Sequence, residues 1–317
     1  MSGILVTGAA GFIGFHACRA LLARGERVIG IDSLNDYYDP ALKRARLDLL
    51  ASSRFTFHAA DIATDEIAPL LAGEKIAAIL HLGAYAGVRL SLTRPDLYLR
   101  NNILGQQGIL GLARILEVGH IVYASSSSVY GAAKPPFRED GTLLPLSPYA
   151  ASKQAAEILS ATYTRLYGIR QTGLRFFTVY GPWGRPDMAY YLFAQAIDRG
   201  EILTLYGDGS AQRDFTYVDD IVVGILSAME RGPQREEAHR IYNLGNDRPE
   251  KISALIAALE RHLGKPARIT RRSPLAGEAQ VTWADIDRAR RELGYEPRTR
   301  LEEGIGKFVA WYRSRNA

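Results

Sequence analysis

The chain has 317 residues, of which 47% are hydrophobic and 23% charged, and its 39 basic and 34 acidic side chains give a formal net charge of +5. These proportions are those of an ordinary globular protein and exclude a largely disordered chain. The modest positive charge leaves a nucleic acid, a membrane surface or an anionic small molecule as the kind of partner to look for.

The first half of the chain predicts a buried parallel sheet. Short, uniformly apolar runs alternate there with longer helical patterns, which is typical of parallel strands that helices cover on both faces. The fold class we expect is therefore α/β, with a doubly wound parallel sheet. The predicted strands are Ile4–Thr7, Arg27–Asp32, Arg54–Phe57, Ala78–His81, His120–Ala124 and, after a long helix from about Ser147 to Tyr167, Gln171–Arg175.

The first predicted strand runs into a glycine-rich loop with the spacing G-x-x-G-x-x-G, which opens a helix. Small residues let backbone N–H groups approach a pyrophosphate at the positive end of that helix. Strand, loop and helix occur in the order that a Rossmann-type dinucleotide site requires, so the context supports the motif. The cofactor contacts expected from this loop are Gly8, Gly11, Phe12, Ile13 and Gly14.

Asp32 ends the second predicted strand, where a carboxylate can accept hydrogen bonds from both ribose hydroxyls of NAD and repel a 2′-phosphate. No arginine follows directly, since the next residues lead to Asn35, which we also expect at the cofactor. NAD is therefore favoured over NADP. Asp61 and Ile62 follow the third predicted strand, and we expect them to contact the adenine.

The regular alternation ends near Tyr180. Glycine, proline and tyrosine punctuate the segment 181–209, and the predicted elements become short and mixed. We expect residues 1–180 to form an NAD-binding Rossmann domain, to which the chain returns around 215–245. Residues 181–317 are expected to form mainly a smaller mixed α/β lobe that binds the substrate.

Tyr149 and Lys153 lie four residues apart in the long predicted helix, so they share one helix face. Ser126 lies in a run of serines at the carboxyl end of the fifth predicted strand, where α/β sheets hold their ligands. Free tyrosine has a pKa of about 10, and we expect Lys153 and an oxidised nicotinamide ring to lower it. In this arrangement Ser126 relays or holds a substrate hydroxyl while Tyr149 takes its proton and the hydride goes to NAD.

Together these features resemble the extended short-chain dehydrogenase/reductase family over essentially the whole chain, and within it the nucleotide-sugar epimerases. Four segments are similar to UDP-glucuronate 4-epimerases, and the first and last are the more specific: Asp32–Pro40, His81–Arg89, Ser125–Gly131 and Arg175–Arg185. The resemblance implies a tightly held NAD that oxidises C4 of a UDP-sugar and then returns the hydride. The chain departs from its relatives at Gly83, where alanine is usual, and at Tyr85, where a smaller or amide residue is frequent.

The resemblance also implies a role for individual residues. It assigns catalysis to Ser126, Tyr149 and Lys153, and it adds Leu82 and Asn101 to the cofactor contacts. Besides Ser126 and Tyr149, the implied substrate contacts are Val88, Arg89, Ser127, Thr178, Arg185 and Arg213. Thr178 stands where many relatives carry asparagine, and its shorter side chain is expected to make room for a carboxylate.

The identity of the sugar depends on Arg185, because a planar guanidinium can hold both oxygens of a C6 carboxylate. A surface arginine in a loop is the competing interpretation. Arg213 resembles the family's diphosphate-binding arginine, and a structural pair with Asp214 is the alternative there. Arg89 follows the fourth predicted strand, where it either faces the substrate or pairs with a nearby acid.

The reaction we expect is C4 epimerisation of UDP-glucuronate to UDP-galacturonate. The serines Ser126–Ser128 include no carboxylic acid, so elimination of a C6 hydroxyl lacks its proton donor and dehydration is disfavoured. A UDP-glucuronate decarboxylase and a neutral UDP-hexose 4-epimerase stay open as alternatives. A non-catalytic NAD-binding regulatory protein is the alternative from another class, although such proteins often lose the Tyr or Lys that this chain keeps.

The partners expected are a UDP-sugar and a second copy of the chain. The helices predicted at Pro95–Glu117 and Ser147–Tyr167 carry broad apolar faces, and in relatives the corresponding pair forms a four-helix dimer interface, although core burial explains the pattern equally well. The basic stretch Arg268–Arg272 is too short to indicate a nucleic acid, and the six histidines have no metal-ligand spacing. With no signal peptide and no bilayer-length apolar run, we expect a cytoplasmic protein without a membrane partner.

Overall fold

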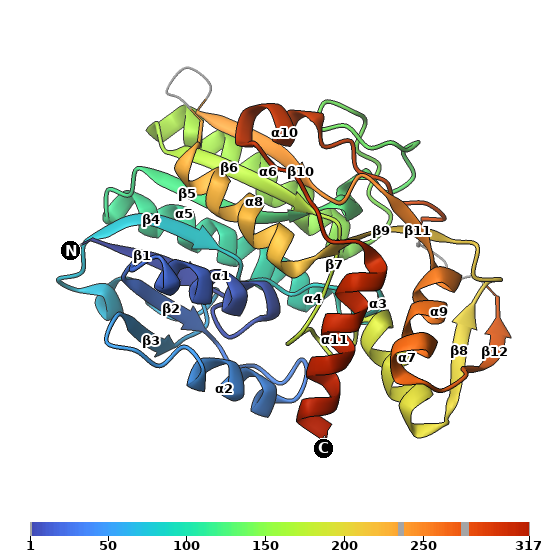
Figure 1. The fold of residues 1–317 in the computed structure, drawn as a ribbon. Coiled ribbons are helices and arrows are strands. Elements are labelled where there is room, and N and C mark those ends of the chain that lie inside the picture. Colours follow the sequence, from blue (N-terminus) through green and yellow to red (C-terminus); the bar gives the residue numbers. More distant parts are fainter. Residues whose placement is uncertain (1, 234–237, 274–278, 317) are drawn as a thin grey trace.

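Seven parallel strands form the central sheet of the protein, of which a computed structural model describes residues 2–233, 238–273 and 279–316 (Figure 1). Their order across the sheet is β10-β6-β5-β4-β1-β2-β3, and every neighbouring pair runs in the same direction. The strands are β1 (Gly3–Thr7), β2 (Val28–Asp32), β3 (Phe55–Ala59), β4 (Ile76–His81), β5 (His120–Ser126), β6 (Arg170–Phe176) and β10 (His239–Leu244). The expected α/β class with a doubly wound parallel sheet is confirmed.

Helices cover both faces of this sheet. Because successive strand residues point to opposite faces, Ile4 and Val6 belong to one hydrophobic cluster while Leu5, between them, belongs to the other. The first cluster takes in α1 (Phe12–Ala23) and α8 (Val218–Glu230), and the second takes in α5 (Gly105–Ile115) and residues of α6 (Pro148–Tyr167). This two-sided burial explains why the strand sequences are uniformly apolar rather than alternating.

A second group of elements lies beside the carboxyl ends of the strands, on the right of Figure 1. Strands β7 (Thr178–Tyr180), β9 (Gln212–Tyr217) and β11 (Pro249–Lys251) form one small sheet, and β8 (Ile202–Tyr206) and β12 (Arg268–Arg272) form another. The helices of this group are α7 (Ala189–Arg199), α9 (Ile252–Leu263) and α11 (Leu301–Asn316). Their apolar residues continue the first cluster, so no separate core divides this group from the sheet.

The helix expected at Pro95–Glu117 contains an irregularity. It starts as α4 (Pro95–Tyr98), widens into a π-helical turn η2 (Leu99–Leu104) and continues as α5. Such turns occur frequently at functional sites, and this one carries the buried side chains of Asn101 and Asn102. The remaining helical elements are α2 (Pro40–Asp48), η1 (Ala68–Leu71), α3 (Val88–Thr93), η3 (Ser127–Tyr130) and α10 (Asp287–Leu293). None of the helices described is both long and apolar enough to cross a membrane.

Candidate active site

A cleft of about 300 Å³ lies at the carboxyl ends of the central strands. Residues that follow β1, β2, β3 and β4 line one part of it, and the end of β5, the start of α6 and the segment after β7 line the other. The strand order reverses between β1 and β4, which is where doubly wound sheets bind their ligands. Most of the predicted site residues line this cleft: Gly8, Gly11, Phe12, Ile13, Gly14, Asp32, Asn35, Asp61, Ile62, Leu82, Asn101, Ser126, Tyr149, Lys153 and Arg185.

The glycine loop lies so close to neighbouring backbone that side chains at its glycines would collide with it. Gly8 has a φ of +71°, and a Cβ atom on it would lie 2.8 Å from the backbone of Leu82 and Gly83. A Cβ atom on Gly14 would lie 2.0 Å from the carbonyl oxygen of Gly8. The loop can therefore keep this shape only with glycine at both positions, and it leaves room for a diphosphate beside the start of α1.

Replacing Gly14 with alanine is expected to remove NAD from the purified protein, because the added methyl group forces the loop backbone to move. The matched control is Gly111→Ala in α5, where nothing lies within 4 Å of the added carbon. Cofactor content after denaturation, measured spectroscopically, checks the prediction. Full NAD occupancy in Gly14→Ala would contradict this view of the loop.

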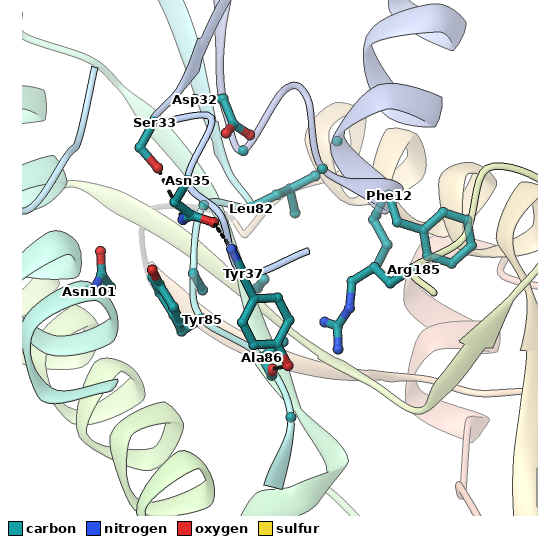
Figure 2. A pocket seen from close by; sticks show the side chains of 18 of the residues that line it. Phe12, Asp32, Ser33, Asn35, Tyr37, Leu82, Tyr85, Ala86, Asn101 and Arg185 are labelled. Atoms are coloured by element: carbon teal, nitrogen blue, oxygen red, sulfur yellow. Dashed lines mark hydrogen bonds between the residues drawn. The ribbon is translucent and has the colours of Figure 1, made fainter. Parts of the chain in front are cut away.

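Asp32 is held at the end of β2 by two backbone donors. Its Oδ1 accepts from the N–H of Leu34 at 2.9 Å and its Oδ2 accepts from the N–H of Ala10 at 3.2 Å. Lys43 of α2 lies nearby, with Nζ 3.9 Å from Asp32 Oδ1 and hydrogen bonds to the backbone and side-chain oxygens of Asn35 at 2.9 and 2.8 Å. Figure 2 shows Asp32, Ser33 and Asn35 together along this side of the cleft. The carboxylate and the glycine loop fit the adenosine half of NAD.

Lys43 and Arg46 belong to a charged stretch of sequence that offers no motif, and sequence reasoning missed both. They are nevertheless three residues apart in α2, which places them on one helix face, and both are buried. Arg46 donates to the carbonyl oxygens of Ala10 at 2.8 Å and Trp183 at 2.6 Å. It therefore joins the glycine loop to the segment that carries Arg185.

The predicted catalytic residues lie together at the centre of the cleft. Ser126 ends β5 and forms a hydrogen bond with Tyr149, and Lys153, one turn along α6, donates to the carbonyl oxygen of Ala124 at 2.9 Å. Burial raises the pKa of Tyr149, while the hydrogen bond with Ser126 and the charge of Arg185 oppose that rise. We expected Lys153 to lower this pKa, and in the structure Ser126 and Arg185 do so instead.

Lys153 is itself the middle member of a stripe along α6 formed by Tyr149, Lys153 and Glu157. Burial lowers the pKa of Lys153 to about 8, and the negative charge of Glu157 opposes the shift. Glu157 is fixed by Arg175 of β6, which donates to its two carboxylate oxygens at 2.8 Å each, and by the hydroxyl of Ser125 at 2.5 Å. Sequence reasoning missed this buried ion pair, because only the fold brings α6 and β6 together.

Arg185 projects into the cleft from the segment after β7, opposite the ring of Tyr37 (Figure 2). Its Nε and Nη2 donate to the two carboxylate oxygens of Asp187 at 2.9 and 2.7 Å. Burial disfavours its charge, but the hydrogen bonds and charge of Asp187 outweigh that effect and raise the pKa of Arg185. Arg185 is thus a fixed cation whose field reaches Tyr149.

Five predicted substrate residues do not line this cleft: Val88, Arg89, Ser127, Thr178 and Arg213. Val88 and Arg89 begin α3, and the guanidinium of Arg89 lies 5.3 Å from the ring centre of Tyr206 in β8. Arg213 donates to the carbonyl oxygens of Gln212 at 2.9 Å and Gln280 at 3.3 Å. Asp214 accepts from the N–H groups of Asn246 and Ala284, at 2.5 and 3.0 Å.

Comparisons with known proteins agree on one family of enzymes. A sequence model of the NAD dependent epimerase/dehydratase family matches residues 4–245. The chain is 45% identical over 328 residues to UDP-glucuronate 4-epimerase 4 of Arabidopsis thaliana, covering 98% of this chain and 75% of that protein. A crystal structure of the UDP-glucuronic acid 4-epimerase of Bacillus cereus with UDP-glucuronic acid and NAD matches with a TM-score of 0.93 at 36% identity, over 99% of each chain. The UDP-glucose 4-epimerase of Thermotoga maritima with UDP-glucose matches with a TM-score of 0.90 at 29% identity, over 99% of this chain and 100% of that one.

Proposed function

The chain belongs to the NAD dependent epimerase/dehydratase family, and from that premise we propose that it interconverts UDP-glucuronate and UDP-galacturonate by inverting C4 of the sugar. The observation that carries the proposal is Arg185, a charged fork that enters the cleft beside Tyr149. A neutral hexose has no group that requires such a cation, whereas a C6 carboxylate does. Similarity over 99% of each chain to the UDP-glucuronic acid 4-epimerase of Bacillus cereus supports the same choice.

When bound, NAD supplies the oxidant that takes the hydrogen from C4 and returns it. The chain supplies the acid–base chemistry and the positioning. Ser126 holds the C4 hydroxyl, Tyr149 takes its proton, and the positive charge of Arg185 favours the phenolate, with Lys153 one turn along the same helix. In the return step, Tyr149 gives the proton back after the sugar has turned over about its diphosphate bonds.

The 4-keto uronate formed in this way is a β-keto acid, which tends to lose CO₂. That loss requires the C5–C6 bond to line up with the π orbital of the C4 carbonyl group. We propose that Arg185 holds the carboxylate so that the C5–C6 bond stays in the plane of the C4 carbonyl group, where this alignment fails. Arg213 then holds the substrate by its UDP part, so the contacts to the sugar can change while the ring turns over.

The test is to incubate the purified protein with UDP-glucuronate, without added NAD, and to separate the products. UDP-galacturonate is the expected product. UDP-xylose would instead indicate a decarboxylase, and a wild-type protein that turns over only UDP-glucose would indicate a neutral-sugar epimerase. The absence of turnover with any UDP-sugar would favour a binding protein and overturn the proposal.

The helix pair α5–α6 supports a homodimer, which we propose as the assembly of the enzyme. Large apolar side chains on these helices and on the π-helical turn before α5 are exposed to solvent: Leu99, Leu104, Ile115, Ile158 and Leu166. Ile158 and Leu166 are 61% and 65% exposed and lie about two turns apart on α6. Several exposed apolar side chains on one helix pair are typical of a subunit interface.

Replacing Ile158 with glutamate is expected to convert the dimer to a monomer, because it puts a charge among these exposed apolar side chains. Leu49→Glu is the matched control, since Leu49 is 59% exposed and lies at the end of α2, away from this helix pair. Sedimentation equilibrium measures the mass of each variant. A wild-type monomer, or an Ile158→Glu dimer as stable as the wild type, would contradict the assembly.

A further inference from the structure

Asp187 uses one edge of the Arg185 guanidinium. Nε and Nη2 donate to Asp187 Oδ1 and Oδ2 at 2.9 and 2.7 Å, a two-point pair that fixes the plane of the group. An arginine has a second edge, formed by Nη1 and the other proton of Nη2, which these bonds leave unused. Because Arg185 lines the cleft and Asp187 does not, we place Asp187 behind the guanidinium and the second edge toward the substrate.

Asp187 is itself held by a residue far away in the sequence. The hydroxyl of Tyr37 lies 3.1 Å from Asp187 Oδ2 and 2.8 Å from the carbonyl oxygen of Ala86, and its ring lies 5.4 Å from the Arg185 guanidinium. Gly87 completes this wall, because a Cβ atom there would lie 2.9 Å from the Tyr37 hydroxyl and 3.8 Å from Arg185 Nη2. The position of Arg185 is therefore set by two segments, the one before α2 and the one before α3.

A pair with the same bonding pattern occurs on the surface of the protein, where both side chains are open to solvent. Arg138 donates from Nε and Nη2 to the two oxygens of Asp140 at 3.1 and 3.4 Å, and these side chains are 63% and 59% exposed. The side chains of Arg185 and Asp187 are only 17% and 35% exposed. The arginine–x–aspartate spacing thus accounts for the ion pair at both places. The pair at Arg185 differs in being buried in the cleft and in contact with Tyr37.

We propose that Asp187, supported by Tyr37, is a positioning residue that presents the second edge of Arg185 to the C6 carboxylate and so keeps the 4-keto intermediate from losing CO₂. This inference rests on the proposed function. Without Asp187 the guanidinium can rotate about its side-chain bonds, and the C5–C6 bond can then turn out of the plane of the C4 carbonyl group. The C5–C6 bond then breaks and CO₂ leaves. The electron pair of the broken bond stays on C5 and forms the enolate of the C4 ketone. The enolate takes a proton at C5 to give the 4-keto pentose.

The Arg185–Asp187 pair also weakens the attraction between Arg185 and the substrate carboxylate. The charge of Asp187 partly neutralises Arg185, so the substrate carboxylate meets an oriented donor rather than an uncompensated buried charge. Such a contact can be released, which epimerisation requires, because the ring must turn over between removal and return of the C4 hydrogen. Asp187 therefore both orients the Arg185 guanidinium and allows the substrate carboxylate to be released.

The test compares the products that wild-type, Asp187→Ala and Asp140→Ala proteins form from UDP-glucuronate. We expect the ratio of decarboxylated to epimerised product to rise about tenfold in Asp187→Ala, which corresponds to the loss of one charge-assisted hydrogen bond. The ratio in Asp140→Ala should equal that of the wild type, because its pair is on the surface. NAD content and affinity for UDP alone, measured on the same preparations, should not change in either variant.

Tyr37→Phe keeps the ring and the Arg185–Asp187 pair, and it should shift the product ratio in the same direction by about two- to threefold. If Asp187→Ala fails to fold, the product ratio of Tyr37→Phe tests the inference in its place. A wild-type product ratio in the folded variants would overturn the inference, as would tighter binding of UDP-glucuronate with that ratio unchanged, which would make Asp187 a competitor of the substrate. Failure of the proposed function is distinguishable, because the wild-type protein itself would then form no UDP-galacturonate.

Discussion

Replacing Tyr149 with phenylalanine is expected to slow epimerisation about 10³-fold while leaving UDP-glucuronate and NAD bound. General base catalysis by a positioned side chain contributes about 10²–10⁴-fold, and the phenol hydroxyl forms a hydrogen bond with Ser126 and lies within the field of Arg185. The aromatic ring, which packs edge-on against Tyr98 with ring centres 5.8 Å apart, stays in place in the variant. The rate of UDP-galacturonate formation, together with calorimetric titration of UDP-glucuronate, checks both parts of the expectation.

Tyr85→Phe is the matched control for this experiment. Tyr85 lines the same cleft and its ring lies against Tyr98, with ring centres 6.0 Å apart, but no catalytic role is assigned to it. Removing the hydroxyl of Tyr85 should leave the rate of epimerisation within about twofold of the wild type, as expected of a change away from the reacting atoms. A Tyr149→Phe enzyme with more than about a tenth of the wild-type rate would show that another group takes the proton.

Replacing Arg185 with alanine is expected to weaken the affinity for UDP-glucuronate by about tenfold or more and to raise the share of decarboxylated product. A charge-assisted hydrogen bond contributes about 1.5–3 kcal/mol, and alanine removes both the charge and the fork. Affinity for UDP alone should be unchanged, because the nucleotide is expected to bind elsewhere. Binding titrations with UDP-glucuronate and UDP, and separation of the products, measure these effects.

Arg185→Lys separates charge from geometry at this position. Lysine keeps a positive charge but cannot bond two oxygens in one plane or pair through two edges. The lysine variant should therefore recover part of the affinity while its product ratio stays shifted toward decarboxylation. If the alanine variant kept the wild-type affinity and product ratio, Arg185 would have no role in recognising the acid sugar.

The sequence was sufficient to predict the fold and that Ser126, Tyr149 and Lys153 would line one cleft, because both depend on local signals. Uniform apolar runs reveal strands that are buried on both faces, and the glycine spacing reveals the loop at the start of α1. The spacing of Tyr149 and Lys153 places them on one face of α6, which the structure confirms. The fold class, the family, NAD as cofactor and the main reaction agree with the comparisons.

The parts that could not be predicted depend on contacts between distant segments. The contact of Tyr37 with Asp187 joins residues 150 positions apart, and that of Arg46 with Trp183 joins residues 137 apart. Tyr37 and Trp183 lie in recognisable segments, but nothing in the sequence indicates that these segments meet Asp187 and Arg46. The π-helical turn at Leu99–Leu104 was missed for another reason, because its apolar pattern is compatible with an unbroken α-helix.

The central claim is that the hydrogen at C4 is removed and returned to the opposite face within one active site. UDP-glucuronate deuterated at C4, incubated with the enzyme in ordinary water, tests it most directly. The account predicts UDP-galacturonate that retains the deuterium at C4, and mass spectrometry with proton NMR locates the label. UDP-galacturonate with hydrogen from the solvent at C4 would contradict the account.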